Sequence, residues 1–334
     1  MDRRKFTLGA GGLLALPGFF YASPARAEDK VHAIFSSAVA NAQLWSSYVS
    51  ASERGVFKKH GLEVEFSEGQ GGGVTSQVIA NGRADFGLGV AASAVINVNG
   101  QGGSVKMVAA DMPVAAIAIL SKAPKKIVKP QDLVGTTIGI PPGTSQALAW
   151  PAFLAKNNVD PKSINVVNVQ LATMRTALLQ GQVDSYLAYS WSNVPLLKSL
   201  GVADPHAMLF SDFGFRLAPD SGIIVRQDLL AAKPDLVKRF VAASSEAWAY
   251  ALANPDAIGA PTKKVFPGVD PAIAAAQINL AAGFFEANKK AGKPLMWQSP
   301  EDWAAQVKTL TELGVAINPK EATSYYSNEF LPTV

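Results

Sequence analysis

The chain has 334 residues, of which 49% are hydrophobic and 17% charged, a composition typical of a globular protein with one large or two medium domains. The net charge of +4 falls to +1 without the first 27 residues, which leaves 26 basic and 25 acidic side chains and argues against nucleic-acid binding. The sequence contains no cysteine, which excludes disulfides, thiolate metal sites, a cysteine nucleophile and a lipid attached at a cysteine.

The first 27 residues have the features of an export signal. A charged start precedes an apolar stretch over residues 8–21, and Ala25-Arg26-Ala27 forms a small-x-small cleavage site. The apolar stretch is too short and too interrupted by glycine and proline for a bilayer span. Arg3-Arg4-x-Phe6 resembles a twin-arginine signal, and an ordinary secretory signal with two chance arginines is the alternative. Both predict a soluble periplasmic protein beginning near Glu28.

Short apolar segments alternate with helix-like ones after the signal. The pattern predicts strands over 31–37, 62–69, 84–90 and 105–112. It predicts helices over 40–61, 71–82 and 93–101, with the second of these opened by a glycine loop. Strands separated by helices indicate βαβ units and a parallel sheet.

The next part of the chain repeats this order. Strands are predicted over 136–143, 164–170 and 183–191, with helices over 144–158 and 172–182 between them. A Gly-x-x-Asp turn follows a helix in both parts, at Gly82 to Asp85 and again at Gly181 to Asp184. Because the flanking elements also correspond in order, we interpret the chain as two similar α/β halves.

The last third begins with a predicted strand over 222–228 and then becomes helical over 234–254, 271–292 and 299–314. Alanine, leucine and aromatic residues recur at helical spacing in these segments. We therefore assign Trp248, Trp297 and Trp303 to packing rather than to a binding site.

No catalytic constellation is evident in the sequence. The three histidines, His32, His60 and His206, lie far apart and lack metal-ligand spacing. The chain also lacks a Gly-x-Ser-x-Gly nucleophile turn and a nucleotide phosphate loop. We therefore expect a binding protein that is not an enzyme and that uses neither a metal nor a cofactor.

Glycine and hydroxyl residues gather where predicted strands give way to helices. In an open parallel sheet, ligands bind beyond the carboxyl ends of the strands, where helix N-termini offer free N–H groups and a partial positive charge. The alternative is that these residues are only helix caps and turns. The candidate ligand-binding residues at these points are Ser36, Ser37, Gly73, Val74, Thr75, Val90, Ala91, Gly143, Thr144 and Ser145.

Three further side chains complete the candidate site. Trp191 follows the predicted strand over 183–191, close to Tyr189, and could form a stacking wall. Arg175, near a helix start, and Arg216, just before the last strand, could pair with a ligand carboxylate or sulfonate. An exposed arginine without a ligand is the commoner situation for either residue.

The motifs resemble those of a known family. Gly55, Phe57, Gly61 and Leu62 at a helix end, the loop of Gly71 to Gly73, and the turn of Gly82, Asp85, Phe86 and Gly87 occur in this order. They resemble the extracytoplasmic solute-binding proteins of ABC importers, in the group that serves sulfonates, taurine, nitrate and pyrimidine precursors of thiamine. The segment over 132–146 resembles the entry into the second domain of that group.

The resemblance covers roughly residues 31–250 and implies an α/β, two-lobe Venus-flytrap fold with two mostly parallel sheets, flanking helices and two hinge crossovers. The implied lobes are residues 28–120 with 222–334, and residues 121–221. The implied function is to capture one small organic anion, as a sulfonate, carboxylate or aromatic acid, and to deliver it to an inner-membrane permease with its ATPase. We expect a monomer.

An exported enzyme or sensor on the same scaffold is the alternative. Fungal relatives that make the thiamine pyrimidine resemble this chain in its first half and carry a cysteine-rich motif. This chain has no cysteine and begins with an export signal, and both features favour the binding protein over the synthase.

Overall fold

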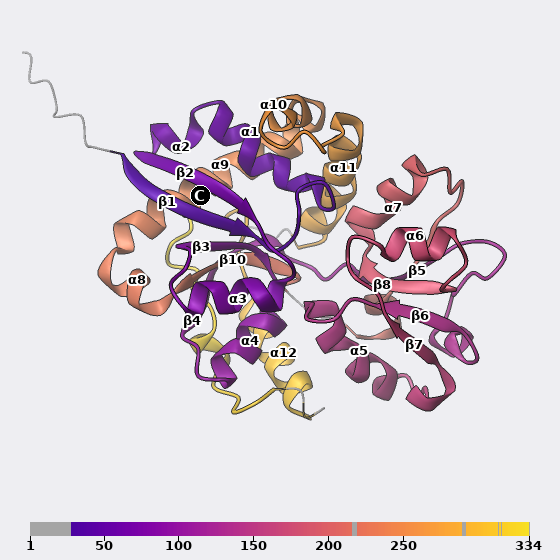
Figure 1. Cartoon of the computed structure of the whole chain (residues 1–334). Coiled ribbons are helices and arrows are strands. Elements are labelled where there is room, and N and C mark those ends of the chain that lie inside the picture. The colour runs from indigo at the N-terminus through magenta and orange to yellow at the C-terminus, as the bar shows by residue number, and fades with distance from the viewer. Residues whose placement is uncertain (1–27, 216–218, 289–291, 313, 315, 334) are drawn as a thin grey trace, which may run out of the picture.

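The computed structural model describes residues 28–215, 219–288, 292–312, 314 and 316–333. The predicted export signal and Arg216 lie outside the described residues. Two parts, each built on its own sheet, lie side by side (Figure 1). We call the part with the first sheet lobe 1 and the part with the second sheet lobe 2.

The sheet of lobe 1 has the strand order β2-β1-β3-β10-β4, and only β10 runs antiparallel to its neighbours. Four strands come from the first third of the chain, whereas β10 returns from beyond lobe 2. The strands are β1 (Asp29–Phe35), β2 (Leu62–Glu68), β3 (Phe86–Val90), β4 (Val105–Met112) and β10 (Ser221–Arg226).

The sheet of lobe 2 has the equivalent order β7-β6-β8-β5-β9, with β5 as its antiparallel strand. Each sheet thus contains one strand from a crossover between the lobes. The expected lobe boundary between residues 120 and 121 would place most of β5 (Ile117–Ser121) in lobe 1, but β5 pairs with β8 and β9 of the second sheet. The other lobe limits stay a prediction. The strands are β5 (Ile117–Ser121), β6 (Thr137–Ile140), β7 (Asn165–Asn168), β8 (Ser185–Tyr189) and β9 (His206–Leu209).

Helices cover both sheets, and those from the last third of the chain pack on lobe 1 (Figure 1). The prediction of one helix over 40–61 is wrong. This segment begins with a 3₁₀ turn at Gln43–Trp45, and the chain turns at Gly55 between two short helices. The α-helices are α1 (Ser46–Glu53), α2 (Val56–Lys59), α3 (Gly72–Ala80), α4 (Ala92–Gly100), α5 (Ser145–Lys156), α6 (Met174–Leu179), α7 (Ser190–Ser199), α8 (Gln227–Ala232), α9 (Pro234–Ala253), α10 (Gly259–Val265), α11 (Pro271–Asn288) and α12 (Pro300–Glu312).

The repeated Gly-x-x-Asp turn makes the same contacts in both lobes. Asp85 Oδ2 accepts a hydrogen bond from the His32 N–H at 2.9 Å, and the Asp85 N–H donates to the His32 carbonyl at 2.9 Å. Asp184 Oδ2 accepts from the Thr137 N–H at 2.9 Å, and its own N–H donates to the Thr137 carbonyl at 2.8 Å. Each aspartate thereby fixes the start of one strand against its neighbour, so the sequence repeat reflects a repeated fold.

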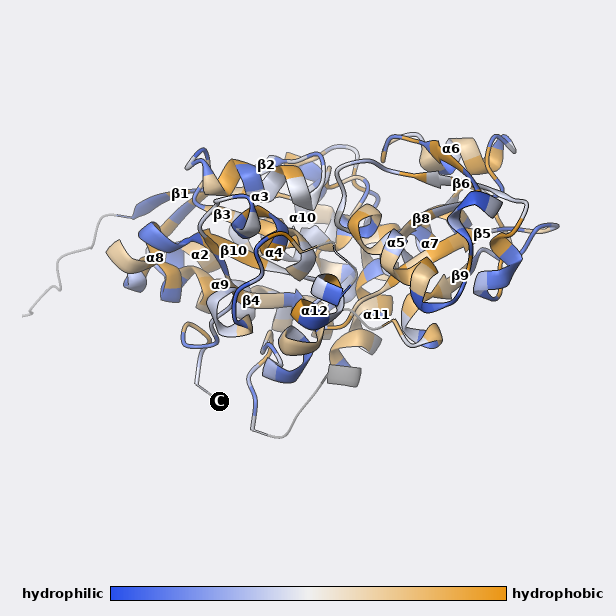
Figure 2. Cartoon of the chain, turned by 90° about the horizontal axis from the view of Figure 1, so that it is seen from below, coloured by the Kyte–Doolittle hydropathy of each residue, from blue (hydrophilic) through white to orange (hydrophobic). Residues whose placement is uncertain are grey.

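The central strands of both sheets, β3 and β10 in lobe 1 and β5 and β8 in lobe 2, are buried on their two faces, as helix-covered strands require, whereas the edge strand β7 is exposed. In β8, Leu187 packs in one core cluster of lobe 2, whereas its neighbours Tyr186 and Ala188 pack in the other. Figure 2, turned by 90°, shows hydrophobic residues in both lobes rather than in one. No helix among the described residues is long and apolar enough to cross a bilayer.

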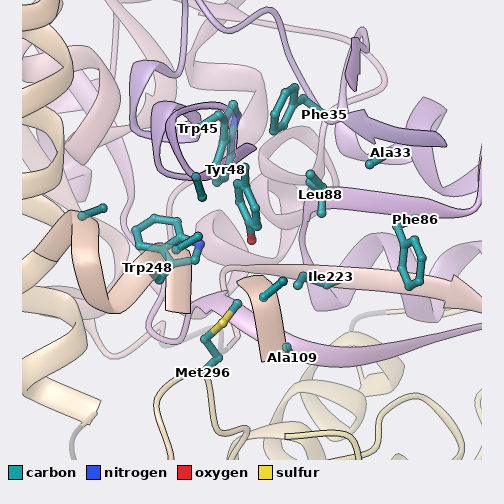
Figure 3. Packing of buried hydrophobic residues seen from close by; sticks show 14 of the residues in the cluster. Ala33, Phe35, Trp45, Tyr48, Phe86, Leu88, Ala109, Ile223, Trp248 and Met296 are labelled. Atoms are coloured by element: carbon teal, nitrogen blue, oxygen red, sulfur yellow. The ribbon is translucent and has the colours of Figure 1, made fainter. Parts of the chain in front are cut away.

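An aromatic cluster forms the centre of the lobe 1 core. Figure 3 shows Phe35, Trp45, Tyr48 and Trp248 around the strand residues Leu88 and Ile223. Trp248 is fully buried here, and Trp303 is buried against Tyr325 and Tyr326 on the other face, as the sequence predicted. Trp297 is half-buried, with the Lys293 ammonium 5.2 Å from the centre of its ring.

Two buried aspartates join the crossovers between the lobes. Asp220, just before β10, accepts a hydrogen bond from the Ala116 N–H at 3.0 Å, and its own N–H donates to the Met112 carbonyl at 3.0 Å. Asp111, near the end of β4, accepts from the hydroxyls of Ser221 and Tyr48. The returning crossover is therefore tied to the outgoing one by side-chain carboxyls as well as by strand pairing.

Burial raises the pKa of both carboxyls. The pKa of Asp220 is raised to about 8, because desolvation outweighs the Ala116 hydrogen bond, and the Asp111 charge raises it further. The pKa of Asp111 is raised to about 6, since desolvation outweighs the hydrogen bonds from Ser221, Tyr48 and Gly89.

We expect the Asp220→Asn variant to lose part of the pH dependence of folding. The folded protein keeps the Asp220 proton to a higher pH than the unfolded chain. The Asp220 carboxyl therefore contributes fully to the free energy of unfolding below about pH 4, and this contribution is lost as the pH rises through about 8. Urea unfolding between pH 6.5 and 8.5 should show a free energy that falls by up to about 1.4 kcal/mol per pH unit in the native chain. The slope should be smaller in Asp220→Asn and unchanged in the exposed control Asp256→Asn; equal slopes in all three proteins would contradict the assignment.

Candidate functional site

A pocket with about 640 Å³ of empty space, part of it continuous with solvent, lies between the lobes. It is bounded by the loop after β1, the 3₁₀ turn at Gln43–Trp45, the end of β8 and the N-termini of four helices, α3 from lobe 1 and α5, α6 and α7 from lobe 2. Its lining residues are Ser36, Ser37, Asn41, Ala42, Trp45, Gly71, Gly72, Gly89, Thr144, Gln146, Leu171, Met174, Arg175, Ala188, Tyr189, Trp191, Ser192, Asn193 and Ser221.

Five of the sequence-predicted residues line this pocket. They share a position just beyond a strand or at the first turn of a helix, where the carboxyl ends of the strands face the other lobe. Thr144 is the N-cap of α5, whose N-terminus lies at the pocket wall. The Thr144 hydroxyl accepts a hydrogen bond from the Ala147 N–H at 3.3 Å. The five residues are Ser36, Ser37, Thr144, Arg175 and Trp191.

The other predicted residues lie elsewhere. Gly73, Val74 and Gly143 line a neighbouring groove between α3, α4 and α5. Thr75 is buried in the first turn of α3, where its N–H donates to the Gly71 carbonyl at 2.9 Å. Val90 and Ala91 are buried where β3 ends and α4 begins, and they also lie outside the pocket lining. Ser145 is the first residue of α5. Arg216 lies outside the described residues. None of these positions is tested as a ligand contact.

Sequence reasoning missed several lining residues. Asn41 and Trp45 fall within the segment predicted as one long helix, whereas the structure has a loop and a 3₁₀ turn there. Asn193 follows Trp191 in the first turn of α7, and Ser221 lies at the crossover into β10. The strand-to-helix pattern that identified Trp191 could also have suggested Asn193, but no local signal marked Asn41.

Arg175 is the one charged side chain among the described lining residues. Its Nη2 donates to Asn41 Oδ1 at 2.6 Å, and its Nη1 lies 3.5 Å from Asn193 Oδ1. The first of these bonds joins lobe 2 to lobe 1. In the described part of the chain, no carboxylate lies within ion-pair distance of the guanidinium. Burial lowers the pKa of Arg175, but the group stays charged at neutral pH.

The rest of the pocket also offers donors. The N-termini of α3, α5 and α7 reach its wall, and each adds a partial positive charge and free N–H groups. The Trp45 indole nitrogen is buried without a hydrogen-bond partner in the described chain. The Trp191 indole lies near the Asp220 carboxyl and lowers its pKa, without meeting hydrogen-bond geometry. A ligand rich in acceptor oxygens complements this arrangement.

Aromatic rings form the apolar side of the pocket. Tyr189 and Trp191 are stacked, with ring centroids 5.5 Å apart and planes inclined by 12°. Trp191 meets Trp45 of lobe 1 edge to face at 5.8 Å. A hydrocarbon or ring portion of a ligand could therefore lie against aromatic surfaces contributed by both lobes.

The chain belongs to the NMT1/THI5-like family, whose family model matches residues 43–258. A binding protein of Brucella abortus is 27% identical over 220 residues, which are 64% of this chain and 66% of that protein. The riboflavin-binding protein RibY of Chloroflexus aurantiacus is 25% identical over 301 residues, covering 89% of this chain and 84% of RibY. The taurine-binding periplasmic protein of Escherichia coli is 28% identical over 177 residues, covering 49% and 54%.

Solved structures confirm the two-lobe fold of periplasmic binding proteins. The alkanesulfonate-binding protein SsuA of Xanthomonas axonopodis pv. citri, solved with bound MOPS, aligns with a TM-score of 0.66 at 17% identity. The alignment covers 90% of this chain and 100% of SsuA. The desulfurization enzyme DszB aligns with a TM-score of 0.58 at 15% identity and covers 90% of this chain and 97% of the enzyme. The fold is thus shared by a binding protein and an enzyme.

We expect the Arg175→Met variant to fold about as stably as the native chain when no ligand is present. The substitution removes two hydrogen bonds to neutral amides, but it also removes the desolvation cost of a partly buried charge. Urea unfolding should give a free energy within about 1.5 kcal/mol of the native value. A loss of about 3 kcal/mol or more, which is the cost of breaking a buried ion pair, would show a structural role for Arg175 instead.

Proposed function

We propose that this protein is the periplasmic solute-binding component of an ABC importer and that it captures one small organic anion, a sulfonate, carboxylate or aromatic acid, between its lobes. The observation that carries the proposal is the half-buried Arg175 guanidinium, which faces the pocket without a carboxylate partner in the described chain. A desolvated cation of this kind is complemented by an anionic ligand, and the fork of its N–H donors suits a carboxylate or a sulfonate.

The relatives support a binding role but differ in what their names say they bind. One is named for riboflavin, one for taurine, and the SsuA structure holds MOPS, a sulfonate. Two of these three names refer to sulfonates, and the third to a fused-ring compound. The charged side of the present pocket suits an acid group such as a sulfonate, and its aromatic side suits a ring. We therefore expect a ligand that carries an acid group and can carry a ring.

The pocket favours binding over catalysis. Its described lining contains no histidine, carboxylate or lysine that could act as a general base, and Arg175 keeps its proton at neutral pH. Lobe closure would enclose the ligand and present both lobes to the permease, whose ATPase supplies the energy for import. Because DszB shows an enzyme on this fold, the experiment below also measures turnover.

A thermal-shift screen tests the proposal. The panel holds MOPS, taurine, nitrate, aromatic carboxylates, riboflavin and thiamine pyrimidines, added to protein that was unfolded and refolded to remove bound compounds. A ligand at 100 times its Kd adds about 2.7 kcal/mol, which at roughly 2–4 °C per kcal/mol raises the melting temperature by several degrees. We expect an organic anion to give this shift and to be recovered unchanged after incubation.

The Arg175→Met variant should lose the shift, whereas Arg83→Met, which removes an exposed arginine on lobe 1, should keep it. A shift caused only by uncharged compounds would contradict the anion site. Chemical conversion of the compound during incubation would instead support the alternative of an exported enzyme.

A further inference from the structure

At one point the backbone of lobe 1 lies close to the backbone of lobe 2. At the start of α3, a Cβ atom built on Gly73 would lie 2.7 Å from the Gly143 carbonyl oxygen, and one built on Gly71 would lie 3.2 Å from the same oxygen. Gly71 and Gly73 belong to lobe 1, and Gly143 precedes the first helix of lobe 2. Their neighbours Gly72 and Thr144 line the pocket, so this contact forms part of its rim.

Space, rather than backbone conformation, requires glycine at position 73. Gly71 and Gly143 have φ values of 127° and 73°, which disfavour any other residue. Gly73 lies in the first turn of α3 with ordinary helical geometry, where alanine is favoured over glycine by roughly 0.5–1 kcal/mol. A Gly73→Ala substitution therefore leaves lobe 1 unstrained. The added methyl group meets only a backbone carbonyl of the other lobe, which has no rotamer by which it could move away.

Two further contacts form in the same arrangement of the lobes. Arg175 donates to Asn41 across the pocket at 2.6 Å, and Gln277 Nε2 of α11 donates to the Ser192 carbonyl of α7 at 2.8 Å. Both contacts need the lobes in this relative position. A steric separation at Gly73 would therefore also lengthen the hydrogen bond through which Arg175 meets lobe 1.

We infer that Gly73 is a closure-determining residue: its lack of a side chain lets lobe 1 close against the Gly143 carbonyl of lobe 2, and ligand retention depends on that approach rather than on a ligand contact by Gly73. The inference rests on the proposed function, because closure matters only if the pocket captures a ligand. It also reassigns two sequence-predicted site residues, since Gly73 and Gly143 act at the rim of the pocket.

Distances between spin labels on the two lobes test the inference. The chain has no cysteine, so cysteines introduced at the exposed positions Arg83 of lobe 1 and Leu179 of lobe 2 are labelled specifically. Double electron–electron resonance is recorded without additive and with MOPS, taurine or riboflavin. The native background should show a closed population that grows with a compound that binds. Gly73→Ala should show only the open distance and should bind that compound at least tenfold more weakly.

The matched control is Gly283→Ala in α11, where an added Cβ meets no atom within 4 Å. It should behave as the native chain does, and urea unfolding should show that Gly73→Ala is as stable as the native chain without ligand. An undiminished closed population in Gly73→Ala, or tight binding by it, would overturn the inference. So would a native chain that binds a compound without ever showing the closed distance. If none of the compounds changes the native distances, the proposed ligand class is contradicted. The closed populations of the native chain and of Gly73→Ala without additive then still show whether Gly73 controls closure.

Discussion

A half-buried guanidinium that meets no counter-ion in the described chain is the interaction on which the rest of the site depends. Arg175 is held by the side-chain oxygens of Asn41 and Asn193, which accept from only part of its five N–H donors and do not neutralise its charge. Taking a cation partly out of water is costly, and a well-placed carboxylate with further hydrogen bonds can offset that cost. Neutral amides on both sides instead leave the positive field directed into the pocket, where the N-termini of α3, α5 and α7 reinforce it. The protein thus accepts a local cost that an anionic ligand would offset.

The duplicated architecture places this charge between the two lobes. Asp85 and Asp184 fix equivalent strands in the two lobes, so the strands of each sheet end toward the other lobe. Asp111 and Asp220 join the two crossovers, and their carboxyls are buried close to the pocket residue Ser221. Closure is then limited by the rim contact of Gly73 with Gly143. The rim and the charge are linked, because a separation of the lobes at Gly73 would also lengthen the hydrogen bond between Arg175 and Asn41.

The sequence predicted the repeat, the strand-to-helix turns and the helices α9, α11 and α12, because these depend on local periodicity and on turn residues, but it did not predict the shorter helices α8 and α10. Thr144, Trp191 and Arg175 line the pocket, since helix starts beyond the strands face the other lobe, and their contact with a ligand stays a prediction. Asn41 and Trp45 escape prediction because the pattern over 40–61 predicts one helix, whereas the chain forms a 3₁₀ turn at Gln43–Trp45 and turns again at Gly55. The strand at Ile117–Ser121 and the rim contact at Gly73 depend on how distant segments meet, and no local pattern encodes that.

Mass spectrometry of what the protein retains tests the central claim most directly. Refolded protein would be mixed with a metabolite extract, separated by gel filtration and measured under native conditions beside Arg175→Met. We predict one retained molecule per chain, bearing a carboxylate or a sulfonate, and none on the variant. A retained molecule that is neutral or cationic, or one that Arg175→Met holds equally well, would contradict the assignment of Arg175 as the anion partner.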